Sequence, residues 1–357
     1  MKLKKIKLII FHPYSKIGGA DKSLSRLING LNKNKYEIIF ITLGKPYIKF
    51  YLQKKIKIIR LFSSRTILAI PEIRKILNKI SPNEKVIFFS NQNFANIISF
   101  FILKKFKNIK HIIMERNHID EFKYPNNFMD FVKKKVIKIL MITLYKKADL
   151  VIGNAKKLSK DLSSLTSTKV KTIYNPAYDN DVLKLSKKKI KLINKKRIIL
   201  NVGRLEVQKD QITILKAIKD MNNIFLIIIG YGQKKKQLID FINENGLSKK
   251  VLILDKVSNP YPYFKKSSLF ILSSLYEGFP NVLTEAIMLK IPIISSNCNS
   301  GPSEILMQNK GVQIFKKGNH RDLKLKIKNF FKDQKLKKRR KFLLFKELKR
   351  FKKKKII

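Results

Sequence analysis

The sequence predicts an α/β protein made of two similar units, each a parallel β-sheet covered by helices. Short runs rich in β-branched residues alternate with longer stretches of helical periodicity, a pattern typical of parallel strands joined by crossover helices. The alternation is interrupted around Asn175-Pro176 and the lysine-rich stretch that follows, and then starts again. A length of 357 residues also fits two domains of about 100–200 residues each.

In the first half of the chain, six apolar runs are expected to form buried strands. They are Ile6–Phe11, Glu37–Ile41, Val86–Ser90, His111–Glu115, Leu150–Gly153 and Val170–Tyr174. Stretches such as Ala20–Leu31 and Asn126–Lys146 have the length and periodicity of helices between strands. The basic start of the chain leads into the apolar run Leu8–Phe11, which is shorter than the ~7–15 residues of a signal peptide, so a first strand is expected there.

The second half repeats the pattern. Its expected strands are Arg197–Val202, Ile224–Ile229, Val251–Leu254, Leu269–Leu272 and Ile293–Ser295, and its expected helices are Gln211–Asp220, Lys234–Asn245 and Asn281–Lys290. The chain is expected to cross between the units within Leu183–Lys196, which lacks Gly and Pro. We therefore predict a first domain over 1–180, a second over 181–334 and a basic tail over 335–357, with a ligand cleft between the domains at the carboxyl ends of their strands.

The net charge raises the question of a polyanionic partner. Lys and Arg number 79 against 24 Asp and Glu, which gives +55, and such a surface binds nucleic acid through counterion release. However, 68 of the cations are Lys and 11 are Arg, whereas phosphate and base recognition favours the planar Arg fork. No RNP-like stretch, zinc finger or basic region with heptads is found. We expect no nucleic-acid partner and attribute most scattered lysines to compositional bias; a polyanion-binding protein is the alternative from a different class.

Few residues are suited to metal or thiol chemistry. The single cysteine, Cys298, excludes a disulfide framework, and the four histidines lie far apart in the sequence, which argues against a Cys/His zinc site. Cys298 has no nearby histidine base, so we expect no nucleophilic role for it. We expect no metal and no other cofactor, and predict that function depends on oxygen, amine and backbone groups.

The most informative segment is Tyr276–Ala286, which follows an expected strand. Pro280 suits the first turn of a helix and Gly278 frees the backbone before it. The amides of Asn281, Val282 and Leu283 are expected to point towards the strand ends and to bind an anion. Glu277 and Glu285 flank this helix start, and carboxylates suit sugar hydroxyls. The segment indicates a ligand that is part phosphate and part polyol, although a capped helix with solvated acids is the simpler alternative.

A second cluster, Asn201–Gln211, follows another expected strand. Gly203 permits a tight turn, Arg204 offers a bidentate fork, and Lys209 lies at the entry of the next helix. Without a metal, an Arg and a Lys together can neutralise a diphosphate leaving group. Two surface cations among 79 are the alternative.

The first domain has two weaker candidates. Gly18 and Gly19 lie between the first strand and its helix, where the backbone can approach a ligand closely. Neither a P-loop nor a dinucleotide-binding fingerprint is present there. His118 follows the strand His111–Glu115 and could project into the cleft, or could be a surface or packing residue.

Together these segments resemble glycosyltransferase family 4 of the GT-B fold. Glu277-Gly-Phe-Pro-Asn-Val-Leu-Thr-Glu285 resembles the Glu-x7-Glu element of that family, and Val202-Gly-Arg-Leu with Lys209-Asp210 resembles its donor-diphosphate element. Gly18-Gly19-Ala20 resembles the N-terminal glycine loop. Ala148–Asn154 and Tyr174-Asn-Pro176 also occur in the usual order, so the resemblance covers roughly residues 6–315.

The resemblance implies two Rossmann-like domains, with a nucleotide-sugar donor bound mainly by the second and an acceptor bound by the first. Arg204 and Lys209 would bind the diphosphate, Glu285 the ribose, Glu277 the transferred sugar, and His118 the sugar near the reacting carbon. The implied donor-binding set also contains Gly18, Gly19, Gly203, Gly278, Phe279, Pro280, Asn281 and Val282.

The implied reaction is metal-independent transfer with retention of the anomeric configuration. The substrate is expected to be a hexose or N-acetylhexosamine on a nucleotide, with UDP favoured and GDP-mannose as the alternative. The Cys298–Ile305 loop resembles that of members that use UDP-N-acetylhexosamines on polyprenyl-diphosphate-linked glycans, although Asn299 replaces a usual Pro. The expected partner is a glycan or polyprenyl-linked acceptor, in cell-surface polysaccharide or lipopolysaccharide synthesis. The sugar, the linkage, the acceptor's identity and the oligomeric state are left open, as is a GT-B epimerase or phosphorylase, although the Glu-x7-Glu element argues against an epimerase.

The basic tail indicates where the protein works. Between Lys335 and Lys355 there are 13 cations and one acid, interleaved with Leu and Phe, a composition similar to that of a basic interfacial helix. A solvated terminus, or a helix packing back on the first domain, is the alternative. The most apolar stretch, Val136–Tyr145, is interrupted by Lys138 and is shorter than the ~18 residues of a spanning helix. We therefore expect a cytoplasmic protein, peripheral on the inner face of the cell membrane, with an anionic membrane surface as partner.

Overall fold

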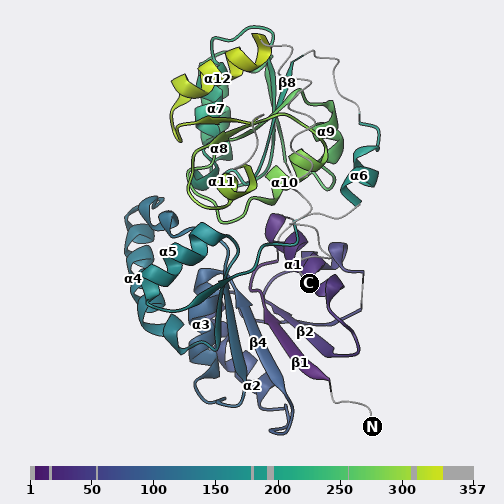
Figure 1. Ribbon diagram of the computed structural model, residues 1–357, viewed down its shortest axis with the longest axis vertical. Coiled ribbons are helices and arrows are strands. Elements are labelled where there is room, and N and C mark those ends of the chain that lie inside the picture. Colours follow the sequence, from purple (N-terminus) through teal and green to yellow (C-terminus); the bar gives the residue numbers. More distant parts are fainter. Residues whose placement is uncertain are drawn as a thin grey trace. The chain divides into compact units, whose positions relative to one another are not determined.

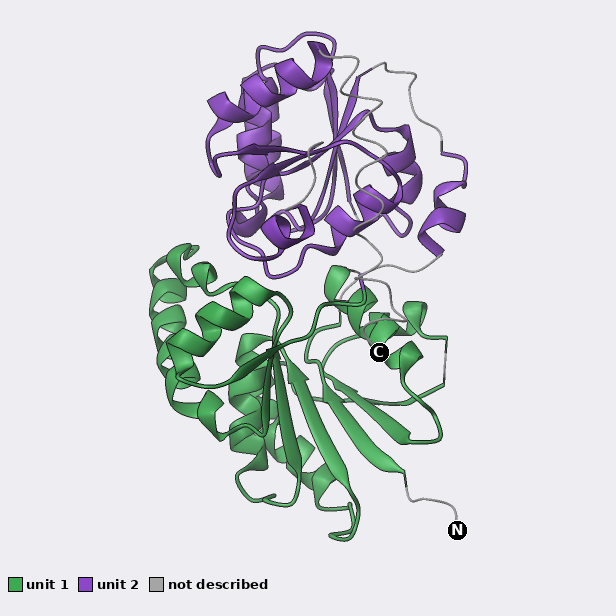
Figure 2. Cartoon of the chain, in the orientation of Figure 1, with its two compact units in different colours: residues 1–176, 356–357 green, residues 177–355 purple. Residues whose placement is uncertain are grey.

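The computed structural model divides at Pro176 and Ala177 into two compact units, unit 1 and unit 2, drawn in green and purple in Figure 2. The structure describes residues 5–15, 18–53, 55–177, 181–190, 197–255, 257–306 and 312–332. The expected boundary at residue 180, the last part of the expected crossing segment and the tail 335–357 lie outside these described residues.

Unit 1 is built on a parallel sheet of seven strands in the order β3-β2-β1-β4-β5-β6-β7 (Figure 1). The strands are β1 (Ile6–Phe11), β2 (Tyr36–Thr42), β3 (Lys57–Arg60), β4 (Val86–Asn91), β5 (Lys110–Glu115), β6 (Leu150–Gly153) and β7 (Val170–Thr172). All six strands expected in this half are present. The edge strand β3 was not expected, because its four residues begin and end with a charged residue and give no apolar run.

The helices of unit 1 cover both faces of this sheet. They are α1 (Gly19–Gly30), α2 (Ala69–Leu77), α3 (Asn93–Leu103), α4 (Phe128–Leu144) and α5 (Lys156–Thr166), with 3₁₀ helices η1 (Tyr47–Tyr51), η2 (Thr66–Leu68), η3 (Ile119–Lys123) and η4 (Tyr145–Lys147). Alternate residues of β1 enter different clusters: Ile9 and Phe11 pack with α2 and α3, whereas Ile10 packs with α1. Burial on both faces explains why these strands are continuous apolar runs.

Unit 2 has a parallel sheet of six strands in the order β10-β9-β8-β11-β12-β13 (Figure 1). The strands are β8 (Ile198–Val202), β9 (Phe225–Ile229), β10 (Val251–Leu254), β11 (Leu269–Leu272), β12 (Ile293–Ser296) and β13 (Gln313–Phe315). The helices are α6 (Asp181–Ser186), η5 (Val207–Lys209), α7 (Gln211–Ile218), α8 (Lys235–Glu244), α9 (Tyr261–Lys266), α10 (Asn281–Met288), α11 (Gly301–Leu306) and α12 (His320–Lys332). The expected strands and helices are present; the edge strand β13 and the helices α6, α9, α11 and α12 are additional.

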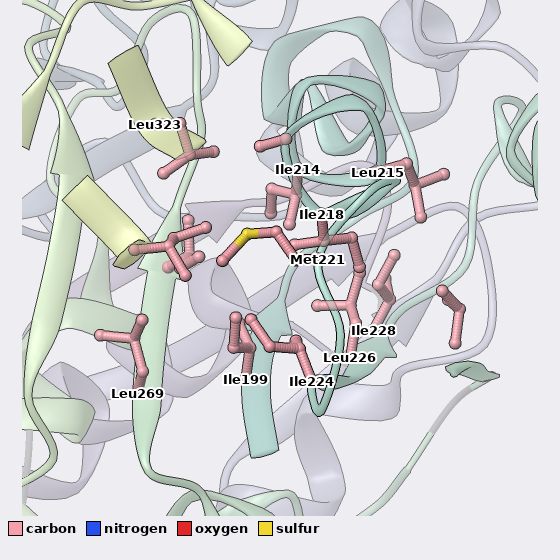
Figure 3. Packing of buried hydrophobic residues seen from close by; sticks show 14 of the residues in the cluster. Ile199, Ile214, Leu215, Ile218, Met221, Ile224, Leu226, Ile228, Leu269 and Leu323 are labelled. Atoms are coloured by element: carbon pink, nitrogen blue, oxygen red, sulfur yellow. The ribbon is translucent and has the colours of Figure 1, made fainter. Parts of the chain in front are cut away.

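The core of unit 2 lies between its sheet and the helices α7 and α12. Leu226 and Ile228 of β9 point into a group of side chains that also contains Ile218 of α7 and Leu323 of α12 (Figure 3). All four are almost fully buried. Among the helices that the structure describes, none is long and apolar enough to cross a membrane.

The strand order fixes where each unit can bind a ligand. In both sheets the order reverses next to the first strand, between β1 and β4 in unit 1 and between β8 and β11 in unit 2. In open parallel sheets, ligands bind outside the carboxyl ends of the strands at such a switch point. In unit 2, a ligand site is therefore expected at the loops after β8 and β11.

Truncation of a core residue tests this packing. We expect Leu226→Ala to lower the unfolding free energy of unit 2 by about 3 kcal/mol, because the removed methyl groups leave a cavity between β9 and α7. Urea unfolding followed by circular dichroism measures this loss. Leu325→Ala, at an exposed position of α12, is the control and is expected to cost less than about 0.5 kcal/mol. Equal losses in the two variants would contradict the described core.

Candidate functional site

The structure brings the two predicted clusters of unit 2 together at the switch point of the sheet. Gly203, Arg204 and Lys209 follow β8, and Glu277 follows β11, its neighbour in the sheet. Leu275 donates its amide hydrogen to the carbonyl of Gln208 at 2.8 Å, which ties the two loops by their backbones. Residues far apart in the sequence therefore share one site.

An ion pair joins the two loops. The Lys209 ammonium contacts Oε1 of Glu277, and both side chains are largely buried. The Ser274 hydroxyl donates to the same Oε1 at 2.6 Å, and Gln208 Nε2 approaches Oε2 at 3.5 Å. A buried carboxylate requires a charged partner and hydrogen bonds. The pair therefore holds a cation and a carboxylate at fixed positions at the end of the sheet.

Arg204 lies beside this pair and is exposed to solvent. Its Nη2 donates to Oε1 of Gln208 at 3.2 Å, and Gln208 Nε2 donates to the carbonyl of Tyr276 at 3.0 Å. Gln208 thus connects the guanidinium to the loop that carries Glu277. Gln208 was not expected from the sequence, in which its only signal is its place between Arg204 and Lys209.

The helix α10 begins at Asn281, directly after Pro280, as the sequence predicted. The amides of Asn281, Val282 and Leu283 were expected to point towards the strand ends and to bind an anion. This is wrong for Leu283, whose amide donates to the carbonyl of Pro280 at 3.0 Å, within the first turn. One turn further, the buried Glu285 accepts a hydrogen bond from the Tyr261 hydroxyl at 3.0 Å. Tyr261, on α9, is a further residue that the sequence analysis missed.

The loop before α10 is held by the loop after β12. Gly301 donates its amide hydrogen to the carbonyl of Gly278 at 2.7 Å, and the Ser300 hydroxyl donates to the same oxygen at 3.2 Å. A Cβ atom at Gly301 would collide with that carbonyl and with the backbone of Phe279. The Ser300–Glu304 segment therefore supports the Glu277 loop as well as connecting two elements.

Glycines after β9 support the loop that carries Arg204. Gly203 donates its amide hydrogen to Ile229 at 3.0 Å, and a Cβ atom at Gly230 would collide with the Gly203 carbonyl. Gly232 has φ of +157° and lies against the backbone of Leu205. This Gly-x-Gly pair was not expected from the sequence, in which its signal is its position directly after a fully apolar strand.

Cys298 lies near this site but is not set up as a nucleophile. Its side chain is buried, and this burial raises the pKa of the thiol to about 12, with a smaller contribution from the Glu277 carboxylate. The thiol is therefore protonated at neutral pH. Within the described ranges, no three His, Cys, Asp or Glu side chains are grouped so that they could hold a metal ion.

In unit 1, the glycine loop leads into α1. Gly19 is the first residue of that helix, and Gly18 precedes it with φ of −168°, an extended conformation open to any residue. A Cβ atom at Gly18 would meet no described atom within 4 Å. Contacts within the described chain therefore do not explain why glycine occupies position 18.

The structure corrects the expectation for His118. Its ring does not project from the sheet edge: the side chain is buried, Nδ1 accepts the amide hydrogen of Asp120 at 3.2 Å, and Nε2 lies 2.9 Å from Oδ2 of Asp161. His118 caps η3 and links it to α5. Both ring nitrogens are used in holding the local fold, because an extended backbone at the N-cap directs the side chain back onto the turn.

A different histidine lies at the switch point of unit 1. His12 directly follows β1, is fully buried, and has Nδ1 at 2.9 Å from Oδ1 of Asn91, which ends β4. Its Nε2 lies 3.1 Å from Oδ1 of Asp21 on α1, which also accepts from the Ser15 hydroxyl at 3.1 Å. No role was expected for His12 from the sequence, although its position after the first buried strand is a signal.

Polar side chains continue along this edge of the sheet. Asn91 is the last residue of β4, Arg116 directly follows β5, and Asn154 directly follows β6. The side-chain amide of Asn154 donates to the backbone carbonyl of Arg116 at 3.3 Å. Within the described part of the chain, three of their buried atoms have no hydrogen-bond partner: Nδ2 of Asn91, Nε of Arg116 and Oδ1 of Asn154. Burial lowers the pKa of Arg116 to about 10, an effect that Asp21 opposes. The row offers donors and an acceptor to a polar ligand.

Beneath this row lies a buried carboxyl group. Glu115, the last residue of β5, accepts from Asn96 Nδ2 at 2.8 Å and from the Tyr145 hydroxyl. Burial raises the pKa of Glu115 to about 8, against the opposing effect of these hydrogen bonds. The side chain is thus protonated in the folded protein near neutral pH.

Most of this chain is similar in sequence to known proteins. A family model described as Glycosyl transferases group 1 matches residues 184–342. An uncharacterized glycosyltransferase of Methanocaldococcus jannaschii is 30% identical over 294 residues, 76% of this chain and 71% of that protein. A Campylobacter jejuni protein, named N-acetylgalactosamine-N,N'-diacetylbacillosaminyl-diphospho-undecaprenol 4-alpha-N-acetylgalactosaminyltransferase, is 28% identical over 271 residues, 74% of this chain and 71% of that protein.

Solved structures show the same fold. HepE of Anabaena, in a crystal structure with UDP-glucose, has a TM-score of 0.78 at 16% identity, covering 98% of this chain and 96% of that chain. At this identity the likeness concerns the fold alone. It confirms the predicted fold class, two Rossmann-like α/β units with parallel sheets as in GT-B glycosyltransferases.

The contact between the glycine loops of unit 2 gives a stability prediction. We expect Gly230→Ala to destabilise unit 2 by about 3 kcal/mol, because the new methyl group collides with the backbone of Gly203 and neither loop can move alone. Thermal and urea unfolding measure the effect. Gly44→Ala, where no atom lies within 4 Å of the new Cβ, is the control and is expected to be close to neutral. A neutral Gly230→Ala would mean that the loops do not touch as described.

The buried carboxyl group gives a pH prediction. Between about pH 4.5 and pH 8 the folded protein keeps a proton on Glu115 that the unfolded chain releases, so the unfolding free energy falls with rising pH by up to about 1.4 kcal/mol per unit. We expect Glu115→Gln to remove this decline, because the amide mimics the protonated acid. Urea unfolding of both proteins over this pH range measures the difference. Parallel curves for the two proteins would refute the raised pKa.

Proposed function

Since this chain belongs to the group 1 glycosyltransferases, we propose that it transfers a hexose or N-acetylhexosamine from a nucleotide sugar to a glycan acceptor, with retention at the anomeric carbon. The observation that carries the proposal is the Lys209–Glu277 ion pair beside Arg204 at the switch point of unit 2. It combines cations for a diphosphate with a carboxylate for sugar hydroxyls. Scattered surface cations would not bring Arg204 and Lys209 next to a buried carboxylate, and a salt bridge that only joined the two loops would not require Arg204 beside it.

The cations of the site suit the leaving group. As the bond between the sugar and the phosphate breaks, negative charge develops on the departing diphosphate and positive charge on the sugar ring. Arg204 can bind phosphate oxygens with its fork, and Lys209 is already held in place by Glu277. Because the ammonium is positioned before the donor arrives, little reorganisation is needed when the charge develops. This arrangement supports transfer without a metal ion, which is part of the proposal.

The carboxylates suit the polyol parts of the donor. Glu277 presents two acceptor oxygens and would bind hydroxyl groups of the transferred sugar while it keeps Lys209 in position. Glu285, held by Tyr261, would bind the ribose hydroxyls. The backbone at the start of α10, over Gly278, Phe279, Pro280, Asn281 and Val282, would lie along the donor. Each group thereby has a role that matches its charge.

The proposed chemistry needs no protein nucleophile. The acceptor hydroxyl attacks the anomeric carbon from the face that the diphosphate leaves, its oxygen forms the new glycosidic bond, and its proton passes to the departing phosphate oxygen. The buried, protonated Cys298 is unsuited to attack, and His118 is engaged with Asp120 and Asp161. His118 therefore has no part in the proposed reaction.

The acceptor is proposed to bind unit 1. The row formed by Asn91, Arg116 and Asn154 offers buried hydrogen-bonding atoms at the carboxyl ends of three adjacent strands. The C. jejuni relative is named for transfer to a diphospho-undecaprenol-linked glycan. On this basis we propose a polyprenyl-diphosphate-linked acceptor, and a UDP-N-acetylhexosamine as the donor favoured by the Cys298–Ile305 loop.

An acceptor linked to polyprenyl diphosphate is held in a membrane, so the enzyme that uses it must work at a membrane surface. We propose that the enzyme works in the cytoplasm, peripheral on the inner face of the cell membrane, in cell-surface polysaccharide or lipopolysaccharide synthesis. The basic stretch Lys335–Lys355, with 13 cations and one acid, supports attraction to anionic lipids. This stretch lies outside the described residues.

Loss of the two cations tests the proposed site. We expect the double variant Arg204→Ala/Lys209→Ala to turn over the donor about a hundredfold more slowly, because the charge of the leaving group is no longer stabilised. Release of UDP from a panel of UDP-sugars, with lipid-linked glycans as acceptors, measures the rate. Arg321→Ala/Lys324→Ala on α12 removes the same charge and serves as control. Donor turnover at the wild-type rate in the Arg204→Ala/Lys209→Ala variant would refute the proposed roles of these two cations.

Ligand binding separates the proposed donor from its alternatives. A ligand at a hundred times its Kd stabilises the folded protein by about 2.7 kcal/mol, which is visible as a thermal shift. UDP is expected to stabilise the protein more than GDP. A larger shift with GDP would favour GDP-mannose as donor, and stabilisation by RNA alone would overturn the transferase proposal in favour of a nucleic-acid-binding protein.

A further inference from the structure

We propose that the outward face of α4 docks onto an anionic lipid membrane. This helix belongs to unit 1 and packs against α3 and α5. Figure 1 shows it at the outside of that unit, away from the strands β1 and β2. The proposal depends on what this helix exposes and would stand without the transferase proposal.

The exposed side of α4 is unusually apolar. Phe128 is 76% exposed, Val136 50% and Ile139 60%. Val132 and Ile142 are also exposed. Single apolar residues on a surface need no explanation, but a group of this size on one element marks a site of interaction.

These residues form one continuous stripe. Phe128, Val132, Val136, Ile139 and Ile142 follow one another at spacings of three or four residues. Such spacings keep side chains on the same side of a helix. The two buried residues of α4, Ile137 and Met141, lie on the opposite side and enter the core of unit 1. The helix is therefore apolar on both sides, and the core of unit 1 accounts for one of them.

The charges around the stripe are positive. The segment from Phe128 to Lys147 has one acid, Asp130, and its exposed lysines include Lys135, Lys138, Lys146 and Lys147. Lys133 and Lys134 are directed elsewhere, to the Phe94 ring and to the Tyr124 carbonyl. Asp130 is paired with Lys134 at 3.1 Å. Lys135 lies over the Phe131 ring, with its ammonium 4.5 Å from the ring centroid, and Lys138 is exposed. Long lysine side chains beside an apolar stripe suit phosphate headgroups above an acyl layer.

The same positive charges argue against a dimer in which the exposed stripe of α4 packs against the α4 of a second copy of this chain. Two such helices packed face to face would bring their lysine rows together, in a chain whose net charge is +55. Like charges at the rim of an interface oppose association, whereas an anionic bilayer offers both an apolar layer and the opposite charge. The lipid surface is thus the partner that matches both the stripe and its flanks.

Binding to vesicles tests the proposal with the full chain. We expect Val136→Gln/Ile139→Gln to partition at least tenfold more weakly onto vesicles of phosphatidylcholine and phosphatidylglycerol, because two exposed apolar side chains no longer enter the bilayer. Ile239→Gln/Leu325→Gln is the matched control, with the same change at positions of α8 and α12 that are 38% and 54% exposed. Equal binding of both variants would overturn the proposal.

A fluorescence reporter separates α4 from the basic tail. The chain contains no Trp, so Ile139→Trp introduces a single reporter on the stripe and Leu325→Trp one on unit 2. With anionic vesicles that contain brominated lipid, the first is expected to shift to the blue and to be quenched, and the second to remain unchanged. If the tail alone held the protein at the membrane, neither reporter would be quenched and the proposal would fail.

Two controls complete the design. The circular dichroism and thermal midpoint of Val136→Gln/Ile139→Gln are expected to match those of the wild type, because Ile137 and Met141 are untouched. Sedimentation of lipid-free protein must not change with the substitution; a dimer that the variant dissociates would assign the face to self-association and overturn the proposal. The vesicle assay contains no donor sugar, so its failure and the failure of the transferase proposal are separate results.

Discussion

The candidate site of unit 2 depends on the ion pair between Lys209 and Glu277. The two residues follow β8 and β11, which are neighbours in the sheet although β9 and β10 lie between them in the sequence. A carboxylate as buried as Glu277 is stable only with a cation and further hydrogen bonds, here from Ser274 and Gln208. The pair thus fixes the end of one loop against the other and, through Gln208, fixes Arg204. Supporting glycines after β9 and β12 then follow as a packing requirement, because loops held this closely leave no room for a Cβ atom.

In this chain, the positions of acidic residues say more about the structure than the positions of basic residues. With 79 basic and 24 acidic residues, a lysine can remain in water without a partner, whereas an acid placed inside must have its charge balanced or must stay protonated. Both solutions occur. Glu277 is paired with Lys209, whereas Glu115 has its pKa raised to about 8 and shares hydrogen bonds with Asn96 and Tyr145. The position of a buried acid is therefore the better guide to where the chain is specialised.

The sequence was sufficient to predict every strand of both sheets except β3 and β13; the other two edge strands, β7 and β10, were predicted. Buried parallel strands are continuous apolar runs, but β3 and β13 lie at sheet edges, are short, and give no such run. In the candidate site, residue types after strands were enough to select Arg204 and Lys209, which the structure brings next to Glu277, and to predict the start of α10. What they could not show is which residues contact each other. The roles of Gln208 and Tyr261 depend on contacts between elements distant in the sequence, and no local pattern encodes them.

Local patterns also could not decide orientation. His12 and His118 each follow a buried strand, yet His12 lies at the switch point of unit 1 while His118 turns back to cap η3. The helix α4 is a similar case: its sequence is apolar on two sides, and periodicity alone cannot tell which side enters the core. The structure shows Ile137 facing inward, which leaves the stripe around Ile139 outside with lysines beside it. A compositional bias could supply lysines anywhere on the surface; their meaning on α4 comes from the apolar stripe that they border.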